Sequence, residues 1–274
     1  MSVVAPRRPA LRYHGSKWRL APWIISHFPD HDQYVEPFGG GAGVLLRKAP
    51  VKIEVYNDLD GEVVNFFRVL RDQTAELLRA IELTPFSRAE MIAARENRCD
   101  GAQIGELSGV ERARRLYVLA WQMYGGPRVQ WKSGWRRTKL SRNANHEGRG
   151  TTVVEDWNNL GSIGVVAQRL KAVAIECSPA EKVITHYDNF QTLFYCDPPY
   201  VFETRLRWKK HEASYVHEMT DLQHQCLASH KPALAKPKPK SAAAVSAPLC
   251  NVCNTRPPQS GFKICATCHD RMVE

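Results

Sequence analysis

A glycine-rich turn constrains the fold of this chain more than any other feature of its sequence. The turn is PFGGGAG at residues 37–43; a strand-like segment at 33–36 precedes it, and an apolar run at 44–46 predicts a helix after it. Glycines in such a turn let the backbone approach a ligand closely, and the start of the next helix favours polar or anionic groups. The segment therefore predicts a strand–turn–helix unit with a ligand site. A tight turn followed by a helix cap is the alternative.

Strand and helix patterns alternate along both outer thirds of the chain. The further segments with a strand pattern are 51–56, 171–176 and 192–196. The segments with helical spacing of apolar residues are 16–28, 58–70, 163–170 and 180–187. Between these parts, residues 74–123 have a helical pattern and residues 125–161 have no clear period. The sequence therefore predicts an α/β fold with one parallel sheet, interrupted by a helical and loop insertion.

The net charge of +10 is concentrated in two segments. Residues 128–149 hold seven basic side chains and one acidic side chain, and residues 231–274 hold seven and two. Lys and Arg neutralise phosphates, and Arg also contacts base edges, so we expect the first segment to bind a nucleic acid. A solvated loop is the alternative. The residues predicted to make these contacts are Arg128, Lys132, Arg136, Arg137, Lys139 and Arg142.

The motif DPPY at residues 197–200 directly follows the apolar strand pattern LFYC at 193–196. In a parallel sheet, the loop that ends a strand lies at the edge where ligands bind. The two prolines restrict the backbone, so the Asp197 carboxylate and the Pro198 carbonyl form a rigid pair of acceptors for an amine with two N–H donors. Tyr200 offers a ring on which a base can stack. For the motif taken alone, a simple strand-ending turn is the alternative.

Four motifs follow one another along the chain: YHGSK at 13–17, EPFGGGAG at 36–43, YND at 56–58 and DPPY at 197–200. With these motifs, the chain from about residue 10 to residue 228 resembles the Dam-like adenine-specific DNA methyltransferases, the D12 class of the alpha group. The resemblance implies a Rossmann-like fold that uses S-adenosylmethionine and carries a target-recognition region before the DPPY motif. It also implies methyl transfer to N6 of adenine in a specific duplex DNA sequence, with the adenine flipped out of the helix.

The resemblance implies a role for each matching position. Lys17 would pair with the carboxylate of the cofactor, Asp58 would bind its ribose, and Tyr200 would stack on the flipped adenine. The cofactor-binding residues that it implies are Tyr13, Lys17, Glu36, Phe38, Gly39, Gly41, Gly43 and Asp58. The catalytic residues that it implies are Asp197, Pro198, Pro199 and Tyr200, of which the first two would hold the target amine.

We expect the chain to have four parts. Residues 1–80 and 170–230 would form the methyltransferase domain, and residues 81–169 the target-recognition insertion. Residues 231–248 are rich in Lys, Pro and Ala and predict a linker. Residues 249–274 predict a small zinc-ribbon-like tail.

Two features depart from the class that the chain resembles. Members of this class usually continue with further strands, so the early start of the linker predicts a truncated sheet. The segment ECSPA at 176–180 places Pro179 where an acid often meets the adenine of the cofactor. A weakly active or inactive DNA-binding remnant is therefore one alternative function. An RNA adenine methyltransferase with the same catalytic loop is the other.

The tail carries two Cys-x2-Cys pairs that are separated by eleven residues. Four thiolates in this spacing favour a tetrahedral, structural Zn²⁺ site. Free thiols or redox pairs are the alternative. The predicted zinc ligands are Cys250, Cys253, Cys265 and Cys268.

The sequence also suggests where the protein works and with which partners. No apolar run approaches ~18 residues, and residues 1–14 lack the apolar segment of a signal peptide, so we expect no membrane partner and a cytoplasmic location. The expected macromolecular partner is double-stranded DNA, and the protein is expected to be monomeric. Protection from a companion nuclease, in a restriction–modification pair, is a role open to such enzymes.

Overall fold

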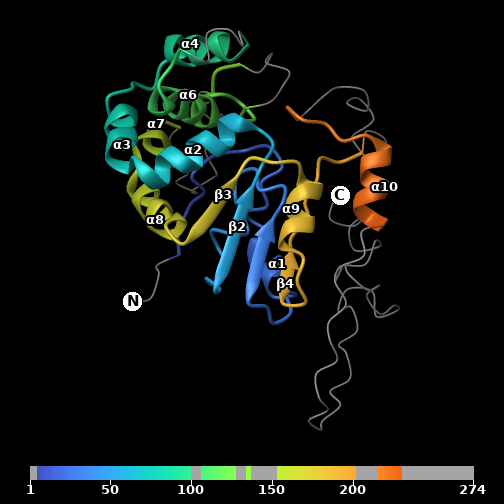
Figure 1. Cartoon of the computed structure of the whole chain (residues 1–274). Helices are drawn as coiled ribbons and strands as arrows, with labels where there is room; N and C mark the ends of the chain where they lie inside the picture. The colour runs from blue at the N-terminus through green and yellow to red at the C-terminus, as the bar shows by residue number, and fades with distance from the viewer. Residues whose placement is uncertain (1–4, 100–105, 128–133, 137–152, 202–214, 230–274) are drawn as a thin grey trace, which may run out of the picture.

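The computed structural model describes residues 5–99, 106–127, 134–136, 153–201 and 215–229. At its centre lies a four-stranded parallel sheet with the strand order β3-β2-β1-β4 (Figure 1). The strands are β1 (Gln33–Glu36), β2 (Ile53–Asn57), β3 (Val173–Glu176) and β4 (Thr192–Phe194). The predicted fold class, α/β with a parallel sheet, is confirmed.

The strand order reverses at β1. The chain adds β2 and β3 on one side of β1 and then returns to place β4 on its other side, so that Val35 lies between Val55 and Phe194. In open α/β sheets, ligands bind outside the carboxyl ends of the strands at such a switch point. The glycine-rich turn follows β1 and the DPPY motif follows β4. The topology therefore brings the two motifs together.

Nine helices lie in the described part of the chain. They are α1 (Ala21–Ile25), α2 (Gly61–Asp72), α3 (Thr74–Glu82), α4 (Arg88–Cys99), α6 (Gly109–Gln122), α7 (Val153–Asn158), α8 (Gly161–Leu170), α9 (Ala180–Tyr187) and α10 (Asp221–Ser229). None of these described helices is long and apolar enough to cross a membrane.

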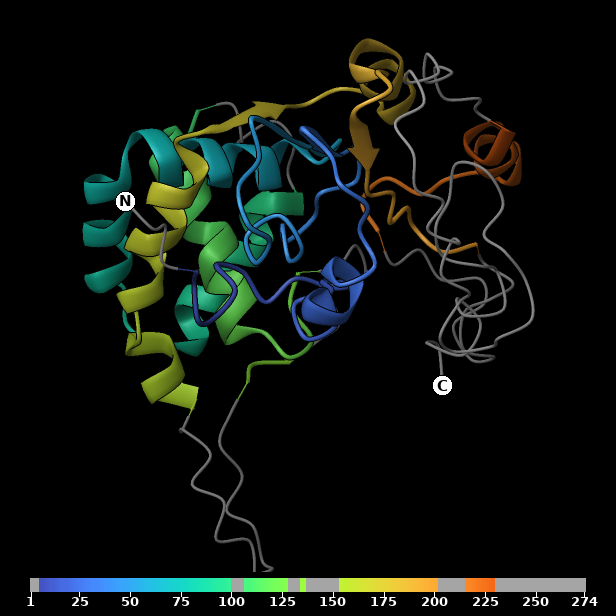
Figure 2. The ribbon, with the colours of Figure 1, turned by 90° about the horizontal axis from the view of Figure 1, so that it is seen from below.

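Alternate residues of the strands face two unequal layers. Tyr34 and Tyr56 belong to the large core, which they share with α2, α6 and α8. Val35 and Val55 point to the other face and form a small cluster with Val183 of α9. Figure 2 shows the helical layer gathered on one side of the sheet, with α9 lying away from it. The thick layer supplies most of the buried apolar surface behind the site.

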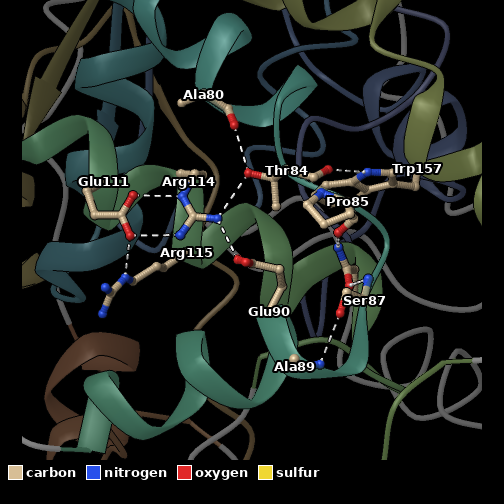
Figure 3. Close-up of polar contacts among 11 residues, drawn as sticks. Ala80, Thr84, Pro85, Ser87, Ala89, Glu90, Glu111, Arg114, Arg115 and Trp157 are labelled. Carbon is tan, nitrogen blue, oxygen red and sulfur yellow. Dashed lines mark hydrogen bonds and ion pairs between the residues drawn. The ribbon is translucent and has the colours of Figure 1, made fainter.

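The helical layer is joined by a polar network around Arg114 of α6 (Figure 3). Two nitrogens of Arg114 donate to the carboxylate of Glu111 at 2.7 and 2.8 Å. Its Nη1 donates to Thr84 Oγ1 at 3.0 Å and to Glu90 at 2.9 Å. The indole of Trp157 donates to the carbonyl of Thr84 at 3.1 Å. One guanidinium thus links α4, α6 and the end of α3, with α7 attached through Thr84.

The helix expected directly after the glycine-rich turn does not form. Residues 43–47 form turns instead, with bonds from Leu46 N to Ala42 O at 3.1 Å and from Lys48 N to Val44 O at 3.0 Å. Two causes limit the segment: Ala42 has a left-handed φ of +53°, and Pro50 disfavours helical backbone at the residue before it. The prediction of a helix at 44–46 was therefore wrong.

Other predicted helices differ from the structure in their ends. The helix expected at 16–28 is limited to α1, which starts next to Pro22 after a series of turns. Helix α2 begins at Gly61 because Asp60, rather than Asp58, caps it by accepting a hydrogen bond from Glu62 N at 3.0 Å. Helix α7 lies within the stretch expected to have no regular period, since six residues are too few to establish one.

The predicted boundary between the methyltransferase domain and the recognition insertion stays a prediction. Helices on both sides of it, α2 and α6, contribute to one continuous hydrophobic core. A short antiparallel bridge joins Met123 and Trp135 in the predicted insertion.

Candidate active site

A cavity of about 270 Å³ lies outside the carboxyl ends of the strands. The loop after each of the four strands contributes to its wall. These contributions are Glu36 to Gly41 with Gly43 and Val44 after β1, Asp58 to Asp60 after β2, Ser178 to Glu181 after β3, and Tyr195, Asp197 and Pro199 after β4. The cavity therefore occupies the switch point that the sheet topology defines.

The structure brings most of the predicted site residues together at this cavity. All eight predicted cofactor-binding residues line it, namely Tyr13, Lys17, Glu36, Phe38, Gly39, Gly41, Gly43 and Asp58. Asp197 and Pro199 of the DPPY motif also line it. Tyr200 lies nearby, with its ring centroid 5.1 Å from Lys17 Nζ, and Pro198 joins the two lining residues of the motif.

Close packing explains the glycines of the turn. A Cβ at Gly39 would lie 2.2 Å from the ring of Tyr56, whose hydroxyl donates to the carbonyl of Gly40 at 2.8 Å. Gly40 itself has a φ of +47°. A side chain at Gly39 would therefore displace Tyr56, which is buried in the core and supports the cavity floor.

Asp58 anchors the glycine-rich turn. Its Oδ2 accepts a hydrogen bond from Gly40 N at 2.7 Å, and its Oδ1 accepts one from Asp60 N at 2.8 Å. Burial raises the pKa of Asp58 to about 6, although the two backbone N–H groups act in the opposite direction. Each carboxylate oxygen can accept a further hydrogen bond, and Asp58 lines the cavity. Asp58 thus holds the turn in place, a role that its position after β2 alone did not predict.

Glu36 is a buried acid at the end of β1, only 2% exposed. Its Oε1 accepts hydrogen bonds from the Tyr34 hydroxyl and from Leu45 N, both at 2.7 Å. Burial, and then the negative charge of Asp197, raises the pKa of Glu36 to about 8, against the effect of these two hydrogen bonds. A cationic group in the cavity would stabilise the ionised form of Glu36.

Lys17 and Asp197 are bonded to each other. Lys17 Nζ lies 2.6 Å from Asp197 Oδ2 and also donates to the carbonyl of Gly15 at 2.9 Å. Burial opposes the charged ammonium, but the charge and the hydrogen bond of Asp197 outweigh it and raise the pKa of Lys17. The family resemblance assigned these side chains to two different ligands, so their direct pairing is a feature that only the structure reveals.

Asn57 joins three of the loops around the cavity. Its Nδ2 donates to the carbonyls of Pro37 and Ser178 at 2.8 and 2.9 Å, and its Oδ1 accepts from Ser178 N at 2.9 Å. The side chain is buried, at 1% exposure, and makes three of its possible hydrogen bonds there. Asn57 therefore fixes the loop after β3 against the loop after β1. Sequence reasoning noted Asn57 only as a letter of the YND motif.

A buried ion-pair cluster supports the turn from below. Lys48 Nζ donates to Glu54 at 2.9 Å, and Arg169 Nη2 donates both to Glu54 at 2.8 Å and to the carbonyl of Leu45 at 3.1 Å. All three side chains are almost completely buried. No motif pointed to this cluster, because its members are distant in sequence and its geometry depends on packing.

The segment after the DPPY motif also contributes to the site, although the sequence did not indicate it. Residues 215–219 line the cavity together with residues 13–17 of the N-terminal motif. The ring of Tyr215 lies 5.5 Å from the ring of His14, and its hydroxyl comes close to Gly15. No spacing or motif in this segment indicated a place in the site.

Several predicted residues lie outside the described part of the chain. Of the six predicted nucleic-acid contacts, the structure describes Arg136, whose Nη2 is paired with Asp156 at 2.7 Å. The others outside it are Arg128, Lys132, Arg137, Lys139 and Arg142, together with the tail cysteines Cys250, Cys253, Cys265 and Cys268. Within the described ranges, no group of three or more His, Cys, Asp or Glu side chains could hold a metal ion.

Comparisons with known proteins agree with this geometry. The family model of the D12 class N6 adenine-specific DNA methyltransferases matches residues 13–241. The chain is also similar to the type II methyltransferase M1.LlaDCHI of Lactococcus lactis subsp. cremoris, with 32% identity over 130 residues. That alignment covers 46% of this chain and 45% of the relative, so the chain matches about half the length of the relative. Because the family model covers most of the sequence, the resemblance is confirmed, and the chain belongs to the D12 class of N6 adenine-specific DNA methyltransferases.

Proposed function

We propose that the protein transfers a methyl group from S-adenosylmethionine to N6 of adenine in a specific sequence of duplex DNA. The observation that carries the proposal is the position of Asp197 in the wall of the same cavity that the glycine-rich turn lines. A cofactor in that cavity and an amine held by Asp197 would be neighbours. Membership of the D12 class supports the choice of adenine and DNA.

The residues of the cavity fit the proposed cofactor. Lys17 offers a cation for a carboxylate, and the buried Glu36 offers a carboxyl group suited to an ammonium. The carboxylate oxygens of Asp58 can each accept a further hydrogen bond, as from ribose hydroxyls. Ser16 Oγ is buried at the same wall and has no hydrogen-bond partner within the described part of the chain, so a polar ligand atom would satisfy it. When bound, S-adenosylmethionine supplies an electrophilic methyl group.

Asp197 and Pro198 would activate the target amine. Conjugation with the purine ring makes N6 a poor nucleophile. If the Asp197 carboxylate and the Pro198 carbonyl accept its two protons in hydrogen bonds, the nitrogen lone pair becomes available for attack. The rigid DPPY backbone then holds the amine in line with the methyl group, which lowers the entropic part of the barrier. The adenine must leave the helix to reach this position, and Tyr200 would stack on it.

The pairing of Lys17 with Asp197 implies an order of binding. In the structure, Lys17 occupies one of the acceptor oxygens that the target amine requires. A cofactor carboxylate would compete for Lys17 and release Asp197 for the amine. Productive binding of the adenine would therefore follow binding of the cofactor.

Incubation with cofactor labelled in its methyl group tests the proposed function. Purified protein would be mixed separately with duplex DNA and with RNA of the same sequence, and the methylated nucleoside would be identified after digestion. We expect N6-methyladenine in the DNA, and none with the variant Asp197→Ala. Label only in RNA would support an RNA methyltransferase, and binding without transfer would support an inactive remnant.

A further inference from the structure

Arginines from distant parts of the chain gather around one carboxylate beside the cavity. Arg136 Nη2 lies 2.7 Å from Asp156 Oδ2, and Arg12 Nη1 lies 3.8 Å from the same oxygen. Burial and then the positive charge of Arg136 lower the pKa of Arg12, and the charges of Arg8 and Arg19 add to this effect. Asp156 acts against them. The positive charge of this cluster therefore exceeds what Asp156 neutralises.

Arg8 of this cluster makes contacts that stabilise the fold. The guanidinium of Arg8 stacks 3.9 Å from the ring centre of Trp121 and donates to the carbonyls of Asn159 and Asp156 at 2.8 and 3.0 Å. The Trp121 indole in turn donates to the carbonyl of Ala10 at 3.0 Å. These contacts fix the N-terminal segment on α6 and α7. Arg8 thus serves as a support that holds the neighbouring arginines in place.

Two other members face solvent. The side chain of Arg12 is 44% exposed, and Arg19 is also exposed. The 3.8 Å separation between Arg12 and Asp156 exceeds an ordinary hydrogen bond, and an exposed ion pair of this kind contributes at most about 1 kcal/mol. The guanidinium of Arg12 also lies 5.8 Å from the ring centre of Trp121, a contact worth about 0.5–1 kcal/mol, so Arg12 can turn towards another anion at a cost of about 1–2 kcal/mol.

Two arginines of the cluster lie next in sequence to residues that line the cavity. Arg12 directly precedes Tyr13, and Arg19 follows Lys17 by two residues; Tyr13 and Lys17 both line the cavity. The carbonyl of Arg12 packs so closely on Gly126 that a Cβ there would lie 2.3 Å from it. Gly126 leads into the basic segment that begins two residues later.

We propose that Arg12 and Arg19 bind a backbone phosphate of the DNA next to the flipped adenine. This inference rests on the proposed function and assigns part of the DNA interface to the N-terminal segment, outside the predicted recognition insertion. Asp156 stays paired with Arg136, while a phosphate replaces Asp156 as the partner of Arg12. Contacts of this kind position the duplex without reading its sequence.

The salt dependence of DNA binding tests the inference. The dissociation constant for a duplex would be measured over a range of salt concentrations for the wild type, Arg12→Gln, Arg19→Gln and the double variant. Each lost phosphate contact reduces the slope of log K against log salt by about 0.9. We expect the double variant to lose about one unit of slope and to bind roughly tenfold more weakly at low salt.

Arg79→Gln is the matched control, because Arg79 is an exposed arginine on α3 and does not line the cavity. It removes one positive charge, as Arg12→Gln and Arg19→Gln each do, and should retain the slope of the wild type. Equal slopes for the double variant and Arg79→Gln would overturn the inference while leaving the proposed function intact. Absence of methyl transfer by a wild type that binds DNA with the expected difference in slope would overturn only the proposed function. A wild type that binds no DNA would overturn both.

Discussion

The pKa values of carboxylic acids shift in opposite directions at the carboxyl edge of the sheet and in the helical network around Arg114. In the network, hydrogen bonds from Arg114 and Arg115 hold the pKa of Glu111 below its usual value despite partial burial. At the sheet edge, burial raises the pKa of Glu36 to about 8 and that of Asp58 to about 6. The network satisfies its charges internally, whereas the cavity keeps acids whose ionised forms would gain from a ligand.

The direction of these pKa shifts separates residues that stabilise the fold from residues that are available for chemistry. Strongly perturbed acids that line a cavity are candidates for a functional site, while paired charges between helices mainly hold elements together. If the distinction is correct, substitutions at the sheet edge should impair binding or rate with little effect on stability. Substitutions in the network should do the reverse.

The largest effect is expected for Asp197→Ala. Removing an acceptor that acts on the target amine should lower the rate of methyl transfer at least about 100-fold, as the loss of a single preorganised polar contact does elsewhere. Labelled-cofactor assays would measure the rate, and equilibrium binding would confirm that the cofactor is still bound. The free energy of unfolding should fall by about 1–2 kcal/mol, because one largely buried ion pair is lost while Lys17 keeps its hydrogen bond to the carbonyl of Gly15. A wild-type rate would contradict the assignment of Asp197.

The complementary change is Arg114→Leu in the helical network. It leaves Glu111, Glu90 and Thr84 without their shared donor, so the free energy of unfolding should fall by about 2–3 kcal/mol. Denaturant titration followed by circular dichroism measures this loss. The rate of transfer well below the unfolding transition should be unchanged.

Arg79→Leu provides the control for that substitution, since it removes an exposed arginine from the neighbouring helix α3 and should change stability by less than about 0.5 kcal/mol. If Arg114→Leu left stability intact but abolished transfer, the division between the two regions would be wrong.

A smaller effect is expected for Lys17→Gln. Loss of the cation that would pair with the cofactor carboxylate should raise the dissociation constant of S-adenosylmethionine about 10- to 30-fold, or about 1.4–2 kcal/mol. Isothermal titration calorimetry measures this change. Lys52→Gln removes an equally charged but exposed side chain that does not line the cavity, and it should leave the affinity unaltered. Equal affinities for Lys17→Gln and wild type would remove Lys17 from the proposed cofactor site.

The last prediction concerns the slope of stability against pH. Glu36 has a pKa of about 8 in the fold, against 4.5 as its ordinary value. Between these values the folded state retains a proton that the unfolded state releases, so the stability from Glu36 is complete below pH 4.5 and is lost as the pH rises to about 8. The corresponding slope is at most about 1.4 kcal/mol per pH unit.

Glu36→Gln should flatten that decline. Denaturant unfolding at several pH values between 6 and 8 compares it with the wild type and with Glu76→Gln, which alters an exposed acid of α3. An unchanged decline in Glu36→Gln would show that Glu36 titrates normally in the folded protein.

Much of the fold could be predicted from local patterns. The strand patterns at 33–36, 51–56 and 192–196 correspond to β1, β2 and β4. Alternating or continuous apolar residues indicate such strands because they reflect burial on the sheet. The pattern of apolar residues at 44–46 did not show that a helix fails to form there. These apolar residues are buried in the large core although they form turns, and the left-handed φ of Ala42 leaves no trace in the pattern of apolar residues.

Strand and helix periodicity and short motifs are local properties, so they were enough to predict the parallel α/β class and the motifs that line the cavity. Which charges meet depends instead on how the chain folds. Lys17 and Asp197 lie 180 positions apart in the chain, and Asn57 reaches Ser178 across the sheet edge. The same holds for Arg12 and Asp156. Such pairs depend on topology and burial, since a side chain's partner and pKa are set by what the fold places next to it.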